Sequence, residues 1–149
     1  MHIGEGRLDV PEQWSNYTVN VFTAATPGMP GMSLTINRDR LPYAVAFEDF
    51  VADQARKAST QLQRFKTIGE ATLEIDSRPA RELEFTWVTQ DAGPVHQLIV
   101  AVADGAQVLN MAVSCPGTMS ASQLEEARRM LRSFRFGDAP ASVEDVAEA

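Results

Sequence analysis

Four runs of alternating apolar and polar residues dominate the second half of this chain and constrain its fold more than any other feature. The runs span residues 68–75, 80–89, 94–101 and 107–114. Short turn sequences separate them, and one of these, Asp104-Gly105, is typical of a tight β-hairpin turn. Strands joined by such short turns run antiparallel, because a parallel connection needs a long crossover. The sequence therefore predicts an antiparallel sheet over this half of the chain.

The first half adds further strands, and each half contains one helix. Strands are predicted at residues 6–10, 17–23 and 32–38, and helices at 47–62 and 122–134. In the 32–38 strand, alternation places Met32, Leu34 and Ile36 on one face and Ser33, Thr35 and Asn37 on the other. Amphipathic helices must bury their apolar stripes on the sheet. The predicted class is α+β, an antiparallel sheet of about six to seven strands packed with two main helices. The layers form either a two-layer or an α/β/α sandwich.

Both helices are predicted from apolar residues recurring at steps of three and four. The first stripe comprises Phe47, Phe50, Val51, Ala55, Ala58 and Leu62, and the second comprises Leu124, Ala127, Leu131 and Phe134. Glu48 and Asp49 fall in the first turn of the first helix, where the helix dipole favours negative charge. Ser122 and Glu125 have the spacing of a capping box at the start of the second helix.

Two glutamines occupy positions where the pattern calls for apolar residues. Gln54 falls in the middle of the first helix stripe, and Gln97 shares a strand face with Val95 and Ile99. An amide in an apolar setting costs roughly 1–3 kcal/mol unless its hydrogen bonds are satisfied. Each glutamine could simply bond a neighbouring backbone group or a water. Together with the polar strand face that carries Ser33 and Asn37, they favour a partly apolar groove that bonds another chain.

The composition is that of one soluble domain that is not expected to bind polyanions. The chain has 149 residues and a net charge of −7, which argues against nucleic acid and anionic membrane surfaces as partners. We predict a single domain over residues 1–136 and an acidic flexible tail over 137–149, which holds four acidic residues and no basic one. No apolar run is long enough for a membrane span. With one cysteine, no secretory signal and no internal disulfide, the prediction is a cytoplasmic protein.

No catalytic, metal-binding or cofactor-binding constellation is apparent in the sequence. Of the two histidines, His96 has no cysteine or carboxylate at ligand spacing, so no metal site is predicted. Cys115 ends an apolar strand and is interpreted as a buried, inert thiol. No glycine-rich phosphate loop occurs. The sequence therefore predicts a binding protein and not an enzyme.

Charged pairs and clusters are interpreted as solvated faces. Glu82 and Glu84 alternate along one strand, and Arg128, Arg129 and Arg132 are placed on the exposed side of the second helix. Charged side chains are rarely fully buried unless they are paired. No functional role is predicted for them.

Several segments together resemble the DcrB-like family, which has a Mog1/PsbP-like fold. They are residues 11–22, 33–39 and 47–54, the triplet Arg78-Pro79-Ala80, and the strand with the central Gln97. No single segment is specific, but their order and spacing are, and the resemblance extends over about residues 1–136. Within the family, the chain is most similar to the Eag chaperones of type VI secretion.

The resemblance implies a function and a set of site residues. Eag chaperones are cytoplasmic homodimers that bind the N-terminal hydrophobic segments of effectors, often of the Rhs or PAAR type, before secretion. The positions that correspond to the client-binding groove are Val19, Val21, Ser33, Asn37, Gln54 and Gln97. Asn37 departs from the small hydroxyl residue expected at its position. No cofactor and no insertion of the chaperone itself into a membrane are implied.

Three alternatives stay open at this point. One is an envelope-associated or lipoprotein member of the same fold, against which the missing signal and lipobox-type cysteine argue. Another is a partner of a small GTPase, which rests on fold analogy alone. The third is a small-ligand-binding domain that uses the same groove.

Overall fold

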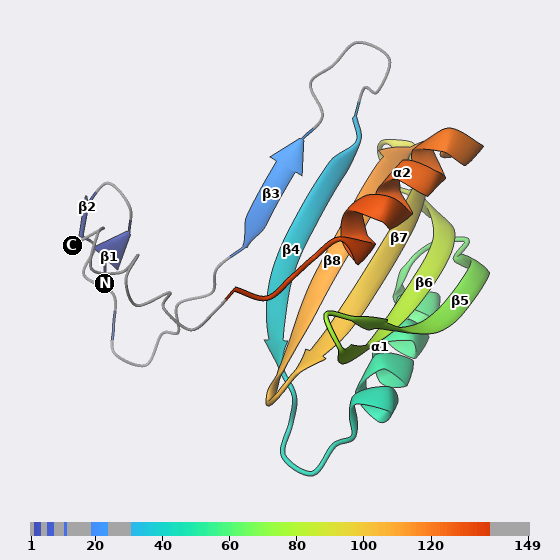
Figure 1. Cartoon of the computed structure of the whole chain (residues 1–149). Coiled ribbons are helices and arrows are strands. Elements are labelled where there is room, and N and C mark those ends of the chain that lie inside the picture. Colours follow the sequence, from blue (N-terminus) through green and yellow to red (C-terminus); the bar gives the residue numbers. More distant parts are fainter. Residues whose placement is uncertain (1, 4–5, 8–10, 12–18, 24–30, 138–149) are drawn as a thin grey trace.

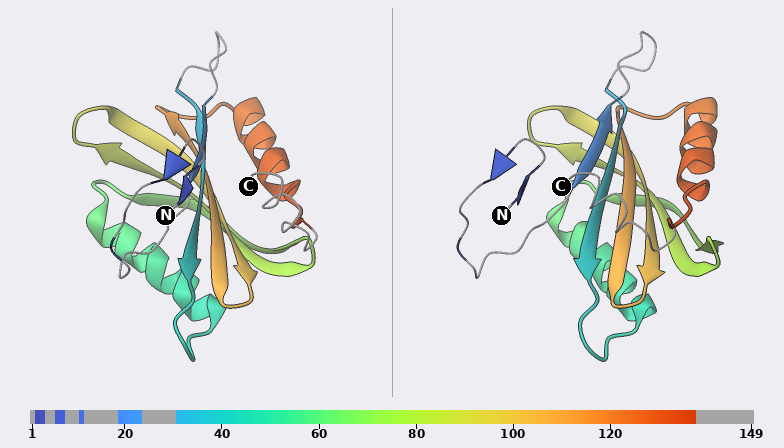
Figure 2. Two further views of the ribbon diagram at one scale, coloured as in Figure 1. Left: turned by 90° about the vertical axis from the view of Figure 1, so that its left-hand side faces the viewer. Right: turned by 60° about the vertical axis from the view of Figure 1, so that its left-hand side comes forward.

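A six-stranded antiparallel sheet forms the centre of the computed structural model, and one helix lies on each face of it (Figures 1 and 2). The structure describes residues 2–3, 6–7, 11, 19–23 and 31–137. Strand bounds are β1 His2–Ile3, β2 Gly6–Arg7, β3 Asn20–Thr23, β4 Ser33–Arg40, β5 Lys66–Ile75, β6 Arg78–Thr89, β7 Gly93–Asp104 and β8 Gln107–Pro116. The helices are α1, Phe47–Gln61, and α2, Ala121–Arg132. The predicted α+β class is confirmed, in its α/β/α form.

The strand order is β3-β4-β8-β7-β6-β5, and every neighbouring pair is antiparallel. The run from β5 to β8 is a meander, as the short turns predicted, while β4 joins the free side of β8. The strand predicted at 17–23 is observed as β3, and residues 17–18 lie outside the described part. β1 and β2 form a separate two-stranded hairpin. The strand predicted at 6–10 overlaps β2, and its remaining residues are also outside the described part.

The main core fills the space between the sheet and α2. It comprises Met32, Ile75, Ala80, Leu98, Val100, Val102, Leu109, Met111, Val113, Cys115, Met119, Ala127 and Leu131. The apolar side of β4 packs here, and Leu34 and Ile36 contact this cluster. Cys115 is buried, as expected from its apolar strand. Burial of this apolar surface, at about 25 cal/mol per Å², is what holds α2 on the sheet.

The N-cap of the second helix lies two residues before the predicted one. The N-cap is Ser120, whose Oγ accepts a hydrogen bond from the backbone N–H of Gln123 at 3.2 Å. In return, the Gln123 Oε1 accepts from the Ser120 N–H at 2.8 Å. The predicted capping box of Ser122 and Glu125 is therefore wrong. A capping box has Glu or Gln three residues after the N-cap, so Ser120 with Gln123 fits the motif as well as Ser122 with Glu125.

Glu82 and Glu84 are buried, which contradicts their interpretation as a solvated face. Each carboxylate bonds the Arg128 guanidinium, Glu82 at 3.1 Å and Glu84 at 2.9 Å. Arg132 adds a bond of 3.2 Å to Glu82. Arg128 and Arg132 thus reach from α2 to the sheet, although the Arg132 side chain stays 47% exposed, and Arg129 pairs instead with Glu125 and Glu126. Ion pairing compensates for the burial of the two carboxylates.

His96 extends this buried network to the start of α2. Its Nδ1 accepts a hydrogen bond of 2.8 Å from the backbone N–H of Met119. Its Nε2 therefore carries the ring proton that is donated to the Glu84 carboxylate, also over 2.8 Å. The histidine links β7, β6 and the segment before α2. The groups around it make it a structural residue of the core.

Candidate binding groove

The face of the sheet that carries α1 is only partly covered. α1 lies over β5, β6 and β7, and Arg81 on β6 donates a hydrogen bond of 2.7 Å to Glu48 in the first turn of the helix. No residue of α1 is fully buried, not even Phe50. The α1-side surfaces of β8, β4 and β3 lie beyond the helix (Figure 2). We call this uncovered surface of β3, β4 and β8, with the adjoining side of α1, the open face.

The strand register arranges the side chains of the open face in three rows. Residues that are Cα partners in adjacent strands point to the same side of a sheet. One polar row runs through Ser33, Ser114 and Gln97. A middle row of small and apolar side chains runs through Val21, Thr35, Ala112 and Ile99. The third row, again polar, pairs Asn37 with Asn110.

Val19 and Val21 provide the apolar surface at the outer end of this face. Their exposed fractions are 47% for Val19, which precedes β3, and 61% for Val21 within it. Large apolar side chains left this exposed mark interaction surfaces when they gather in one place. Val21 continues the middle row through its partner Thr35, and Val19 lies just before the strand.

Gln97 is held by two side-chain hydrogen bonds. The Trp87 Nε1 donates to the Gln97 Oε1 at 2.6 Å, and the Gln97 Nε2 donates to the Ser114 Oγ at 2.7 Å. A primary amide has two acceptor sites and two donor hydrogens. One of each remains for another partner. Gln97 is therefore both a structural link across β6, β7 and β8 and a fixed polar group beside the open face.

Asn37 belongs to a second polar chain at the other border of the open face. Asn110 Nδ2 lies within hydrogen-bonding distance of both the Asn37 Oδ1, at 3.1 Å, and the Asp39 Oδ2, at 2.9 Å. The bond from Asn110 orients the Asn37 amide through its Oδ1 and does not use its NH₂ group. The larger side chain at this position is thus accommodated by pairing across β4 and β8.

Gln54 projects from α1 into the space between the helix and the sheet. It lines a cavity of about 270 Å³ together with Ile99, Ala101 and Asn110. Its side chain is exposed, so the helix stripe is interrupted by a solvent-accessible amide and not by a buried one. The cavity places Gln54 beside Asn110, the partner of Asn37. The six predicted positions thus occupy one side of the sheet and its flanking helix.

Sequence reasoning missed several residues of this surface. Alternation places Thr35 on the same face as Ser33 and Asn37. It does not connect this face with Trp87, Asn110, Ala112 or Ser114. Their place depends on which residue of one strand lies opposite which residue of the next. Alternation within a strand reveals the face and not this register.

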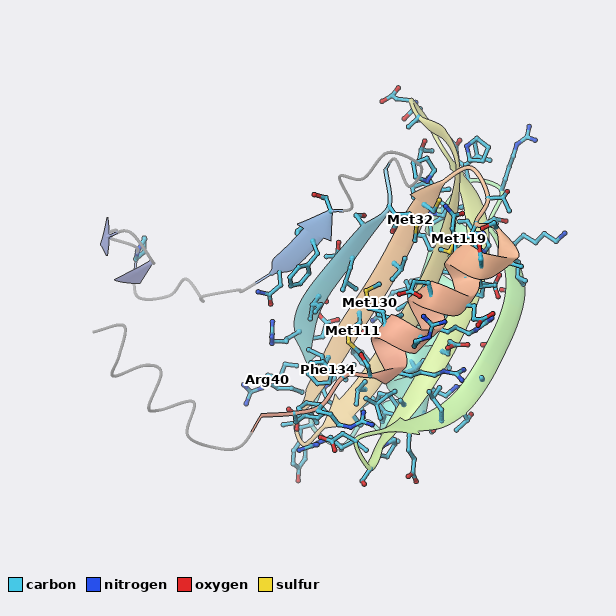
Figure 3. The ribbon with its side chains drawn as sticks, turned by 45° about the horizontal axis from the view of Figure 1, so that its top comes forward. Met32, Arg40, Met111, Met119, Met130 and Phe134 are labelled. Carbon is cyan, nitrogen blue, oxygen red and sulfur yellow. The ribbon has the colours of Figure 1, made fainter. Side chains whose placement is uncertain are left out.

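A larger hollow on the α2 side was also not predicted. It has a volume of about 870 Å³ and lies between β3, β4 and α2. Phe22, Met32, Leu34, Val113 and Met130 line it, with polar residues of α2 at its border. Met32, Met111, Met119 and Met130 all lie on this side of the sheet (Figure 3). Neither Gln54 nor Gln97 lines this hollow, and Ser33 is the one predicted site residue that does.

No group of three or more His, Cys, Asp or Glu in the described part of the chain could hold a metal ion. Neither α1 nor α2 combines the length and apolar character that a membrane-spanning helix requires. The described surface instead carries a half-buried strip of apolar and small side chains, exposed at Val21, between two borders of ordered amides and hydroxyls.

Two comparisons with known sequences assign this chain to a family. The chain matches the model of the DcrB family over residues 5–133 and belongs to that family. It is 30% identical over 84 residues to the Pseudomonas aeruginosa protein named Effector EagT6. The alignment covers 56% of this chain and 58% of that relative, so it extends over little more than half of each.

Two solved structures share the fold. A Pseudomonas aeruginosa protein of unknown function, PA94, superposes with a TM-score of 0.71 at 22% identity, covering 93% of this chain and 96% of its own. LpqN, described as involved in cell envelope biogenesis of Mycobacterium tuberculosis, superposes with a TM-score of 0.51 at 14% identity. That match covers 82% of this chain and 77% of LpqN. At these identities the likeness concerns the fold alone.

Proposed function

We propose that this chain is a non-enzymatic chaperone of a type VI secretion effector. Its client is the N-terminal hydrophobic segment of an effector of the Rhs or PAAR type, which it shields in the cytoplasm before secretion. The observation that carries the proposal is the open face, where exposed Val21 continues a row of small and apolar side chains between two polar rows, and exposed Val19 lies just before β3. Membership of the DcrB family and similarity to an Eag protein support the same function.

The open face suits a transmembrane-type helix. Such helices pack closely where small residues let the backbones approach, and they use hydroxyl and amide side chains to bond across the contact. Thr35 and Ala112 are small side chains in the middle row. The remaining donor and acceptor of Gln97 and the exposed amide of Gln54 can bond hydroxyls or distorted backbone groups of the client. The polar rows also limit the apolar area that the empty protein presents to water.

The energetic need for such a chaperone follows from the client. Each leucine-sized side chain that stays in water forgoes roughly 1.5–3 kcal/mol of burial. A hydrophobic segment of about 20 residues, the length of a membrane span, therefore aggregates unless something covers it. A groove that covers one side of the helix and leaves the contact reversible would keep the segment ready for release.

The experiment that tests the proposal is co-expression with the first ~60 residues of the neighbouring large effector-like gene product, a length that holds two spans of ~20 residues. Co-purification that is lost when the hydrophobic segment is deleted is the expected result. A chain that purifies alone while the effector fragment aggregates would refute the proposal.

A matched pair of variants locates the client on the open face. Val19→Asp should lower client affinity at least tenfold, because binding would bury an unpaired carboxylate. Ile68→Asp is the control, since Ile68 is 50% exposed and Val19 47%, but it lies on β5 at the other end of the sheet. Both variants should fold normally. Equal affinity of the two variants would exclude Val19 from the contact.

A second candidate function rests on the hollow beside α2. Its volume of about 870 Å³ falls in the range of small-molecule sites, and its lining is mostly apolar. A small apolar ligand bound there would raise the melting temperature of the protein without any effector fragment. Protection of the protein by such ligands, abolished by Met130→Glu, would favour this function over the chaperone.

A further inference from the structure

Two exposed arginines follow the hollow on the α2 side along β4. Leu34 and Ile36 pack against the main core, so the alternation of the strand places Arg38 and Arg40 on the same side of the sheet. Both arginines are exposed, and Arg38 donates a hydrogen bond of 3.3 Å to the Asn20 Oδ1 on β3. Neither belongs to the ion pairs that fix α2 on the sheet. The sheet next to the hollow therefore carries positive charge on its α2 side.

The hollow itself leaves apolar side chains open to water. Phe22 is 56% exposed and Met130 is 40% exposed, and both line the hollow. Exposed apolar side chains that gather in one place mark an interaction surface. Glu126, an acidic residue of the lining, forms an ion pair with Arg129, which compensates for its charge. The hollow and the two arginines together suit a short segment that contains both apolar side chains and carboxylates.

The chain that follows α2 leads to this end of the sheet. Phe136 packs against the main core, and the Arg78 guanidinium lies 3.7 Å from the centre of its ring. Arg78 pairs with Asp104, and the strand register continues from Asp104 through Gln107 to Arg40. The segment runs from α2 past β8 toward β4 in Figures 1 and 3. The residues after 137 therefore begin on the α2 side, at the end of the sheet that carries Arg40.

Residues 138–149 have the composition that this surface suits. They include four acidic residues, no basic residue and two valines, Val143 and Val146. Val143 lies six positions after residue 137, a span of up to about 20 Å when extended. The stretch of β4 from Arg40 to Leu34 is also six residues long, or about 20 Å. Val143 is therefore within reach of the hollow while carboxylates of the segment stay near the arginines.

We propose that residues 138–149 fold back on the hollow as an intramolecular strap. Val143 and Val146 enter the hollow, and the acidic side chains of the segment lie beside Arg38 and Arg40. A tethered segment has a local concentration of about a millimolar, so a contact with a millimolar dissociation constant is already about half occupied. The strap lies on the side of the sheet opposite the open face, and it does not depend on the client proposed there.

The strap would regulate access to the hollow. A small apolar ligand or a segment of another protein reaches Phe22 and Met130 only when residues 138–149 are displaced. Attraction between exposed charges is screened by salt, with a Debye length of about 8 Å at physiological ionic strength and about 3 Å at 1 M. Salt should therefore open the hollow, and so should reversal of the charge of the two arginines.

Disulfide trapping in the full-length protein tests the strap. One variant combines Val143→Cys with Met130→Cys, because Met130 lines the hollow. The control combines Val143→Cys with Ser133→Cys. Ser133 is exposed, lies nearer to the segment along the chain and is not one of the described residues that line the hollow. Cys115 is buried and remains in place. The rate of intramolecular disulfide formation under mild oxidation is followed by mass spectrometry and non-reducing electrophoresis.

The disulfide should form at least tenfold faster with Met130→Cys than with Ser133→Cys, although Ser133 is closer in sequence. Adding Arg38→Glu and Arg40→Glu should slow the reaction several-fold, and so should salt at about 1 M. Lys66→Glu is the charge-matched control, because Lys66 is exposed on β5 at the other edge of the sheet, and it should leave the rate unchanged. Equal rates at the two cysteine positions, or a rate with Met130→Cys that the arginine substitutions do not change, would overturn the proposal.

Binding of the uncharged dye Nile red measures whether the hollow is covered. Replacing both valines by serine, in the Val143→Ser, Val146→Ser variant, should raise dye fluorescence several-fold. Adding Met130→Glu should reverse the increase, because a carboxylate in the lining disfavours an apolar ligand. The control is the Ala139→Ser, Ala141→Ser variant, which alters the same segment and should leave the fluorescence unchanged. Equal fluorescence of the two double variants would refute the strap, whether or not the protein binds an effector fragment.

Discussion

Replacing Gln97 should have two separable effects, one on stability and one on client binding. Gln97→Ala removes the acceptor of the Trp87 indole N–H, at 2.6 Å, and the donor to Ser114, at 2.7 Å. An unsatisfied buried polar group costs about 1–3 kcal/mol, and all three residues are half-buried, so water relieves part of that cost. We expect a loss of about 1–2 kcal/mol, or roughly 2–8 °C in melting temperature for a chain of this size.

Gln54→Ala is the matched comparison. Within the described residues the Gln54 amide makes no hydrogen bond, and its side chain is exposed on α1. Surface substitutions of this kind change stability by less than about 0.5 kcal/mol. In the client complex, however, each glutamine should contribute a hydrogen bond of about 1 kcal/mol, so each alanine variant should lower affinity about fivefold. Only Gln97→Ala should also lower the melting temperature.

A double-mutant cycle isolates the structural part of the Gln97 effect. Trp87→Phe keeps an aromatic ring and removes the indole N–H, so it breaks the same hydrogen bond from the other side. Thermal or urea unfolding of Gln97→Ala, Trp87→Phe and the double variant should give a coupling energy of at least about 0.5 kcal/mol. Strictly additive losses would show that the Trp87–Gln97 bond does not stabilise the fold. Normal client affinity in the Gln54→Ala, Gln97→Ala double variant would limit both glutamines to structural roles.

Two further predictions concern α2, and both are checked by chemical denaturation. Arg128→Ala should destabilise the fold by about 2–4 kcal/mol, because two buried carboxylates lose a partner. Arg129→Ala, on the exposed side, should cost less than about 0.5 kcal/mol. Equal losses in the two variants would contradict the buried network. Ser120→Ala should cost about 1 kcal/mol through loss of the helix cap, and Ser122→Ala close to nothing. A larger loss of stability from Ser122→Ala than from Ser120→Ala would instead favour Ser122 as the N-cap.

Periodicity in the sequence predicted the two helices, the strands of the main sheet and the alternation of residues along each strand. The alternation of Leu34 with Thr35 separates the side of β4 that packs against the main core from the side that belongs to the open face. Periodicity carries this information because it is local to each element. Residue pairing between strands is not local. The partners of Gln97 and Asn37 could therefore not be read from one chain.

The buried carboxylates show a different limit. Glu82 and Glu84 alternate with Leu83 and Phe85, so one side of β6 had to be charged, and a solvated face was the simplest reading. Helices cover both sides of this sheet, so β6 has no solvated face. Arg128 and Arg132, spaced four residues apart on α2, match the two carboxylates in the packed structure. These ion pairs form only when α2 packs on the sheet. The periodicity of α2 or of β6 alone does not indicate them.

The two sides of the sheet divide stability and function between them. The main core lies with α2, where Leu98, Val100 and Val102 are fully buried and the ion pairs fix the helix. α1, in contrast, contributes no fully buried residue and leaves three strands beside it uncovered. Because the α2 side supplies most of the buried apolar surface, the open face is free to combine exposed valines with ordered amides. On the α2 side, stability depends on buried apolar side chains, whereas on the α1 side Val21 stays more than half exposed. This exposed apolar surface is what a hydrophobic client would cover.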